Sequence, residues 1–189
     1  MNDDRSRWEE RYSARSAQGM EPSAFVVAHA ASIHGRALDL AAGAGRNTLF
    51  LARRGVLVEA IDIAFAGLQQ LRAIATAEAL PISLIQADLE AFPLPVERYD
   101  AILNIRYLQR SLFTPIQRAL KPGGIVVFET FLIDQLQIGH PRNPAFLLQR
   151  GELRAAFAGF EILEYYEGGV GAEPQAFLAQ MVARRPAIA

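Results

Sequence analysis

The chain has 189 residues, about half of them hydrophobic, with a formal charge of −1 and no cysteine. This length fits one domain with short extensions, and the composition supplies enough apolar side chains for a core. The near-neutral charge argues against nucleic acid or an anionic membrane as a partner. The lack of cysteine excludes disulfides, thiolate metal sites and a cysteine nucleophile, and nothing in the sequence indicates a metal site.

The N-terminus is polar and charged. It lacks the apolar stretch of a signal peptide, and the sequence has no uncharged run long enough for a membrane helix. We therefore expect a soluble, cytoplasmic protein. Trp8 and Tyr12 are spaced to share one helical face, so residues 1–21 are predicted to form a helical lid segment that precedes a main domain at 22–189.

The main domain alternates apolar runs with helix-like segments. Helices are expected to begin at Pro22, running to residue 34, and over 46–55, 64–80, 111–120 and 152–159. Strands are expected over 37–41, 56–62, 82–88, 99–105, 125–131, 160–166 and 176–185. "KPGG" before the fifth run is typical of a turn. Because parallel strands need crossover helices, the pattern predicts an α/β fold with a doubly wound sheet. Only a loop joins the last two strands, which therefore form a hairpin.

In such sheets ligands bind beyond the carboxyl ends of the strands. The first strand is followed by a bend that contains Gly43 and Gly45, and it also carries Asp39. A dinucleotide fingerprint would have a third glycine where Thr48 stands, and an acid at Asp39 would repel a pyrophosphate. The loop therefore favours a ligand with a positive head, although a tight turn that caps the next helix would use the same glycines.

Acids also end the second and third strands. Asp62 can accept from both hydroxyls of a ribose, and it can also cap the following helix. Asp88 can accept from an adenine amino group while Leu89 packs on the ring, but a solvated loop acid would look the same. The fourth strand ends with Asn104, Arg106 and Tyr107 near the same edge, and Tyr107 could equally be a packing residue.

Together these motifs resemble the class I S-adenosylmethionine-dependent methyltransferases. "LDLAAGAG" is similar to their glycine-rich motif, with Ala41 where a first glycine often stands, and Asp62 matches the acid after their second strand. "ADLEAFPLP", "YDAILNIRYL" and "LKPGGIVVFET" are similar to their next three motifs. "GAGRNTLFLARRG" and the Trp-x-x-x-Tyr helix resemble the TehB-like, tellurite-resistance-type group. The resemblance implies a mostly parallel seven-stranded Rossmann-like sheet with an antiparallel last strand.

The resemblance also implies which residues hold S-adenosyl-L-methionine. Asp39 would lie near the methionine amino group, Asp62 would accept from the ribose hydroxyls, and Asp88 would accept from the adenine amino group. Arg46 is a candidate for the methionine carboxylate, or a surface helix arginine. The expected cofactor-binding residues are Asp39, Ala41, Gly43, Gly45, Arg46, Asn47, Asp62, Ile63, Asp88, Leu89, Asn104 and Arg106.

The implied reaction is in-line methyl transfer to a small-molecule acceptor. The thioether leaving group needs no acid, so the protein mainly has to hold the nucleophile, the methyl group and the sulfur in line. A hydroxyl or ammonium acceptor would also need a base. Tyr107 and His140 are the candidates, and no acid–base pair is recognisable. The expected substrate-contacting residues are Trp8, Tyr12, Tyr107, His140 and Arg142.

Two other functions stay open. A nicotinamide-dependent oxidoreductase would bind NAD, and Asp39 and Thr48 count against it. A non-catalytic protein that binds S-adenosylmethionine would have the same loop and would differ only in lacking turnover. No large insertion offers a domain for a macromolecular substrate, so we expect a small-molecule acceptor, with no nucleic acid or membrane partner. The acceptor atom and the oligomeric state are left open.

Overall fold

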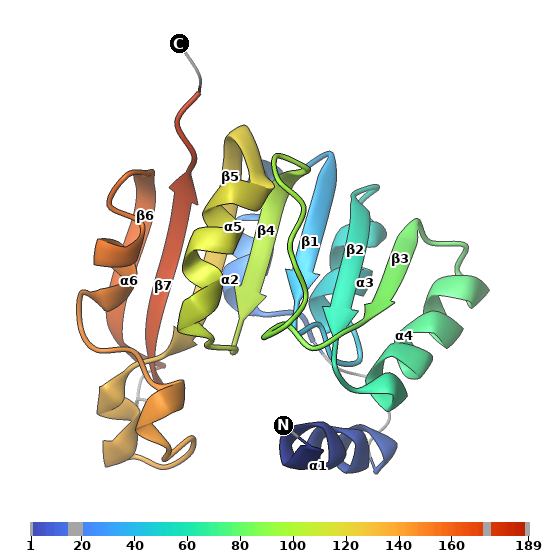
Figure 1. Cartoon of the computed structure of the whole chain (residues 1–189), viewed down its shortest axis with the longest axis horizontal. Coiled ribbons are helices and arrows are strands. Elements are labelled where there is room, and N and C mark those ends of the chain that lie inside the picture. The colour runs from blue at the N-terminus through green and yellow to red at the C-terminus, as the bar shows by residue number, and fades with distance from the viewer. Residues whose placement is uncertain (1, 15–20, 172–174, 188–189) are drawn as a thin grey trace. The chain divides into compact units, whose positions relative to one another are not determined.

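A computed structural model describes residues 2–14, 21–171 and 175–187. Its seven strands form one sheet in the order β3-β2-β1-β4-β5-β7-β6, flanked by helices (Figure 1). This confirms the predicted mostly parallel seven-stranded sheet, in which β7 is antiparallel to its neighbours β5 and β6. The chain divides into two compact units, Met1–Pro93 and Leu94–Ala189, and each is described by itself.

The first unit holds three parallel strands. Its elements are α1 (Asn2–Ser13), α2 (Ala24–Ala28), η1 (Ala30–Ser32), β1 (Arg36–Leu40), α3 (Arg46–Ala52), β2 (Leu57–Asp62), α4 (Phe65–Ala77) and β3 (Ile82–Gln86). β1 pairs in parallel with β2, and β2 with β3. β1 and β2 are buried along almost their whole length, as expected for strands covered on both faces. Leu49, Ala60 and Leu71 pack together in this core.

The second unit joins a parallel pair of strands to a hairpin. Its elements are β4 (Tyr99–Ile105), η2 (Arg110–Leu112), α5 (Phe113–Ala119), β5 (Leu120–Phe131), η3 (Ile133–Gln137), η4 (Pro144–Phe146), α6 (Glu152–Ala156), β6 (Glu161–Val170) and β7 (Ala176–Arg184). The rings of Phe113, Phe128 and Phe157 meet edge to face at 5.9–6.2 Å between centroids. This aromatic cluster ties α5 and the segment after α6 to β5.

Two local predictions were wrong. The helix expected over 22–34 is only the short α2 followed by η1. α2 ends at His29, whose backbone N–H donates to the Val27 carbonyl and whose ring Nδ1 lies 2.8 Å from the Phe25 carbonyl oxygen. The "KPGG" turn lies inside β5, where the pairing with β4 passes from Tyr99–Leu120 to Ala101–Ile125. The segment bulges out of the ladder instead of preceding the strand.

Helix α1 packs on α4 within the first unit. The Glu9 carboxylate accepts a hydrogen bond from the Ala66 backbone N–H at 3.2 Å, and the Gln70 side chain donates to the Tyr12 carbonyl at 2.5 Å. Figure 1 shows α1 lying beyond the carboxyl end of β2. Of the predicted lid segment, residues 1 and 15–20 lie outside the described residues. No helix in the described ranges is both long and apolar enough to cross a membrane.

Candidate functional site

Asp39 lies near the end of β1 and is almost fully buried, with 2% of its surface exposed. The Thr48 hydroxyl on α3 donates to its Oδ2 at 2.6 Å. Burial raises the pKa of Asp39 to about 6, against an ordinary value of 3.8, and the Thr48 hydrogen bond and the Arg46 charge only partly offset this. A carboxylate with so little water around it interacts strongly with any cationic group that reaches it.

The loop after β1 has the backbone conformation of a glycine-rich motif. Ala41 has a φ of +53°, Gly43 of +59° and Gly45 of +82°. These are left-handed values that favour glycine. Ala41 therefore adopts the geometry of the glycine that often stands at its position. A Cβ on Gly45 would overlap the buried side chain of Leu71, so this glycine also lets α3 pack against α4.

Asp62 closes the same loop from the end of β2. Its Oδ2 accepts from the Gly43 N–H at 2.7 Å, and its Oδ1 accepts from the Ala64 N–H at 2.8 Å. The carboxylate thus ties the loop to β2 and to Ala64, the residue before α4. Burial raises the pKa of Asp62, although these backbone hydrogen bonds act in the opposite direction. The helix cap predicted as one role of Asp62 is not found, because Ala64 is the N-cap residue and makes no side-chain cap, and the Ala66 N–H of the first turn is bound by Glu9. The other predicted role, a ligand acceptor, is compatible with this geometry.

The residues after β2 and β3 lie at the same end of the first unit. Ile63 is half-buried, and Leu89 is buried with 6% exposed. Asp88 is half-buried and accepts from the Glu90 N–H at 2.9 Å, so it begins a turn. The geometry leaves these three residues as candidate contacts of an adenine ring.

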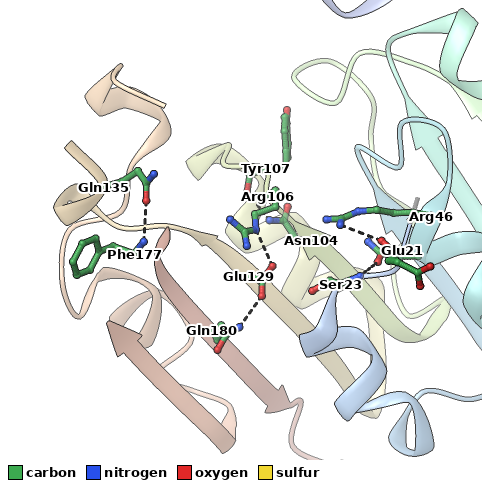
Figure 2. A network of polar contacts seen from close by, with 11 residues as sticks. Glu21, Ser23, Arg46, Asn104, Arg106, Tyr107, Glu129, Gln135, Phe177 and Gln180 are labelled. Atoms are coloured by element: carbon green, nitrogen blue, oxygen red, sulfur yellow. Dashed lines mark hydrogen bonds and ion pairs between the residues drawn. The ribbon is translucent and has the colours of Figure 1, made fainter. Parts of the chain in front are cut away.

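Arg46 and Asn47 bind the segment that leads into α2. An Nη group of Arg46 donates to the Glu21 carbonyl at 3.3 Å (Figure 2), and the Asn47 side-chain oxygen accepts from the Ser23 N–H at 2.9 Å. Asn47 is buried, with 5% exposed. These contacts give both residues a role in holding residues 21–23 against α3, in addition to the cofactor contacts expected for them.

Tyr12 covers the glycine loop. A Cβ on Gly43 would overlap its hydroxyl, and a Cβ on Gly67 would lie 3.2 Å from its ring. The ring therefore lies beside two glycines whose lack of side chains makes room for it. Burial, with the Asp62 carboxylate nearby, raises the pKa of Tyr12 to about 12. Trp8 stacks on Tyr12 with 5.8 Å between ring centroids, which confirms that the two share one helical face.

In the second unit, Asn104 and Arg106 build the turn that follows β4. The Asn104 side chain, 1% exposed, donates to the Tyr107 carbonyl at 2.6 Å. The Nε of Arg106 donates to Oε1 of the buried Glu129 at 2.9 Å, and Gln180 on β7 donates to Oε2 at 2.7 Å (Figure 2). Tyr107 is half-buried.

The connection after β5 carries His140 and Arg142, both exposed. It is anchored by Gln135, whose side chain donates to the His140 carbonyl at 2.8 Å. The same side chain accepts from the Phe177 N–H at 2.8 Å (Figure 2). Arg110 anchors it further by donating to the carbonyls of Ala145 and Leu147, each at 2.8 Å. The connection is thus a fixed structure that keeps His140 and Arg142 at the surface.

In the first unit Asp62 and Tyr12 both meet Gly43, and Asp39 lies close enough to affect the pKa of Tyr12. In the second unit Arg106 pairs with Glu129, and Asn104 binds the Tyr107 carbonyl. Three residues that contact the site were not predicted from the sequence: Glu9, Gly67 and Gln180. The role of Thr48 as the hydrogen-bond partner of Asp39 was not predicted either. Each of these acts through a residue that is distant in the chain, and no local motif marks it.

Residues 37–124 match the model of a family described as methyltransferase domain. The hemagglutinin 1 of Eikenella corrodens is 30% identical over 139 residues, which cover 70% of this chain and 46% of that protein. The malonyl-[acyl-carrier protein] O-methyltransferase of Salmonella typhimurium is 32% identical over 98 residues, covering 49% of this chain and 38% of the other. The chain thus spans less than half the length of these curated relatives.

Among solved structures, TehB from Haemophilus influenzae superposes with a TM-score of 0.75 at 23% sequence identity, covering 94% of this chain and 67% of that one. At this identity the likeness concerns the fold. The family model agrees with the predicted resemblance to S-adenosylmethionine-dependent methyltransferases over residues 37–124, and the TehB structure shows that the fold is shared.

Proposed function

We propose that this protein binds S-adenosyl-L-methionine and transfers its methyl group to a small-molecule acceptor, because residues 37–124 match the model of a methyltransferase domain. The observation that carries the proposal is the arrangement in the first unit, where Asp39 and Asp62 flank a left-handed glycine loop. When bound, S-adenosyl-L-methionine supplies a methyl group on a positively charged sulfur, which leaves as a neutral thioether.

The charges of the loop fit a cationic ligand. Asp39 and Asp62 are both buried. Burial is the main cause of the raised pKa of Tyr12, and the Asp62 and Asp39 carboxylates raise it further. Two buried carboxylates at one loop repel a pyrophosphate and attract a sulfonium or an ammonium group. This supports S-adenosylmethionine over a nicotinamide dinucleotide.

Each residue of the loop then has a defined task. Asp62, already oriented by the Gly43 and Ala64 N–H groups, retains lone pairs that can accept from the two hydroxyls of a ribose. Asp39 holds the amino group of the methionine tail, and Gly43 lets the backbone approach the ligand closely. The chain's contribution to the reaction is to orient the two reactants and exclude water.

The test is calorimetric titration of the full chain with S-adenosylhomocysteine and, separately, with NADH. We expect measurable binding of S-adenosylhomocysteine and none of NADH. Binding of NADH alone, or of neither ligand, would contradict the proposal. A second experiment separates an enzyme from a protein that only binds the cofactor. The protein is incubated with S-adenosylmethionine and a panel of thiols and small acids, and mass spectrometry detects any S-adenosylhomocysteine that forms.

Helix α1 is proposed to be a lid over this site. Replacing Tyr12 with alanine removes the ring beside Gly43 and Gly67, and we expect S-adenosylhomocysteine to dissociate about tenfold faster, the effect of losing roughly 1.4 kcal/mol of contact. Trp8 is the single tryptophan of the chain and stacks on Tyr12, so its fluorescence in a stopped-flow displacement experiment reports on the lid directly.

The matched control is Ser13→Ala, a change at an exposed position of the same helix, which should leave the dissociation rate unchanged. Tyr12→Phe separates the hydroxyl from the ring. If saturating S-adenosylhomocysteine leaves the Trp8 emission unchanged, and Tyr12→Ala releases the ligand at the wild-type rate, α1 is not a lid.

A further inference from the structure

Arg106 holds an unfavourable backbone conformation directly after β4. Its φ of +61° is in the left-handed region, where a residue with a Cβ is disfavoured. The turn is held there by the Arg106 N–H, which donates to the Glu129 carbonyl at 2.6 Å, and by Asn104, which donates to the Tyr107 carbonyl. Strained backbone conformations that several contacts hold in place are concentrated at ligand-binding sites. Here the strained residue is Arg106, so its side chain has a fixed direction.

The Arg106 side chain is also held by specific contacts. Its Nε donates to Glu129 Oε1, and its guanidinium carbon lies 4.7 Å from the centre of the Phe131 ring. Gln180 holds the other oxygen of Glu129. The Glu129 side chain is only 4% exposed, whereas that of Arg106 is 34% exposed. The carboxylate is therefore a buried support, and the guanidinium reaches the surface.

The ion pair between Arg106 and Glu129 uses only one nitrogen of the guanidinium, and this indicates what the other two nitrogens can do. An arginine that only neutralises a buried carboxylate commonly meets it with two parallel N–H groups. Here only Nε donates to Glu129, and the second oxygen of Glu129 accepts from Gln180. Within the described ranges, Nη1 and Nη2 of Arg106 have no hydrogen-bond partner. Two coplanar donors at the end of a clamped guanidinium match the two oxygens of a carboxylate.

We propose that Arg106 is the acceptor-binding residue of the second unit and that the methyl acceptor carries a carboxylate, which Nη1 and Nη2 bind. Glu129 is its positioning residue. With both its oxygens occupied by donors, Glu129 orients the guanidinium and does not act as a base. This inference rests on the proposed function only in assigning the carboxyl ends of β4 and β5 to the acceptor, and it replaces the cofactor contact that the sequence predicted for Arg106.

The probe for the test is benzoate, with benzamide as its uncharged isostere. Both are titrated into the full ¹⁵N-labelled chain while the arginine Nε–Hε signals are followed by nuclear magnetic resonance. We expect benzoate, and not benzamide, to shift the Arg106 signal, which is assigned by its loss in Arg106→Lys. Benzoate affinity should fall at least tenfold in Arg106→Gln, since a charge-assisted hydrogen-bonded pair is lost.

Two further variants separate binding from structure. Glu129→Gln keeps the packing and weakens the orientation, so it should reduce benzoate affinity less than Arg106→Gln does. Arg184→Gln removes an exposed arginine of β7 that pairs with Glu161 and lies opposite Ile125, away from the carboxyl end of β5, and it should leave benzoate binding unchanged. If benzoate does not shift the Arg106 signal, if benzamide binds equally well, or if Arg184→Gln weakens binding as much as Arg106→Gln does, the proposal is overturned.

Calorimetry with S-adenosylhomocysteine tests the cofactor site separately from the acceptor site at Arg106. Arg106→Gln should bind S-adenosylhomocysteine with wild-type affinity, which also shows that the variant is folded. Wild-type protein that binds benzoate through Arg106 but not S-adenosylhomocysteine would refute the cofactor assignment alone. The reverse result would refute the acceptor assignment alone.

Discussion

Replacing Asp62 with alanine is expected to weaken S-adenosylhomocysteine binding by about a thousandfold. A carboxylate that accepts from two ribose hydroxyls makes two charge-assisted hydrogen bonds, each worth roughly 1.5–3 kcal/mol, and every 1.4 kcal/mol is about tenfold in affinity. The carboxylate is held in place by the Gly43 N–H at 2.7 Å and the Ala64 N–H at 2.8 Å. Calorimetric titration of wild type and variant measures the difference.

Because Asp62 also ties the loop to β2, a loss of binding could reflect a loosened loop. Asp62→Asn addresses this, since its amide oxygen can still accept from one backbone N–H while its charge is gone. Asp100→Asn is the control: it removes an acid that pairs with Lys121 in the second unit and should bind normally. Wild-type affinity in Asp62→Asn, within about threefold, would show that the carboxylate does not hold the ribose.

Replacing Asp39 with asparagine is expected to stabilise the fold at pH 7.5 and to weaken the ligand about a hundredfold. Burial raises the pKa of Asp39 from 3.8 to about 6. The folded protein therefore keeps a proton that the unfolded chain releases, so stability falls as the pH rises from about 4 to about 6. Above that pH range the ionised Asp39 carboxylate lowers the free energy of unfolding by about 3 kcal/mol.

An asparagine at this position carries no charge, and its side-chain oxygen can still accept from the Thr48 hydroxyl. The gain in the free energy of unfolding should reach about 2 kcal/mol at pH 7.5 and vanish near pH 4, where Asp39 is protonated. Urea denaturation at pH 4, 5, 6 and 7.5 measures it. The pKa of Asp62 is also raised, so only the difference between variant and wild type isolates Asp39.

The loss of affinity follows from the same carboxylate. Its hydrogen bond to the amino group of the methionine tail would contribute roughly 2–3 kcal/mol, which asparagine cannot replace. A variant that is less stable than wild type at pH 7.5, or equally stabilised at pH 4 and pH 7.5, would contradict the burial argument. Unchanged ligand affinity would remove Asp39 from the cofactor site.

The sequence by itself determined the sheet and the carboxylates of the first unit. "ALDLA" and "VLVEAID" are short runs of apolar residues that suit strands buried on both faces, and each carries an acid at or near its carboxyl end. Because parallel strands place these ends at one edge, local pattern alone predicts that Asp39 and Asp62 gather around the Gly43 loop. Both the strands and their parallel pairing are found.

Only the tertiary structure decided the partners of these residues. Arg106 meets a glutamate 23 residues away, which in turn meets a glutamine 51 residues further along, and Tyr12 lies against Gly43 and Gly67. Such contacts depend on strand register and helix docking, and no local spacing encodes them. The same holds for "KPGG", which has the composition of a turn but becomes a bulge because β5 pairs with β4 on both sides of it. Local sequence fixes which residues reach the sheet edge, whereas long-range packing fixes what each one can bind.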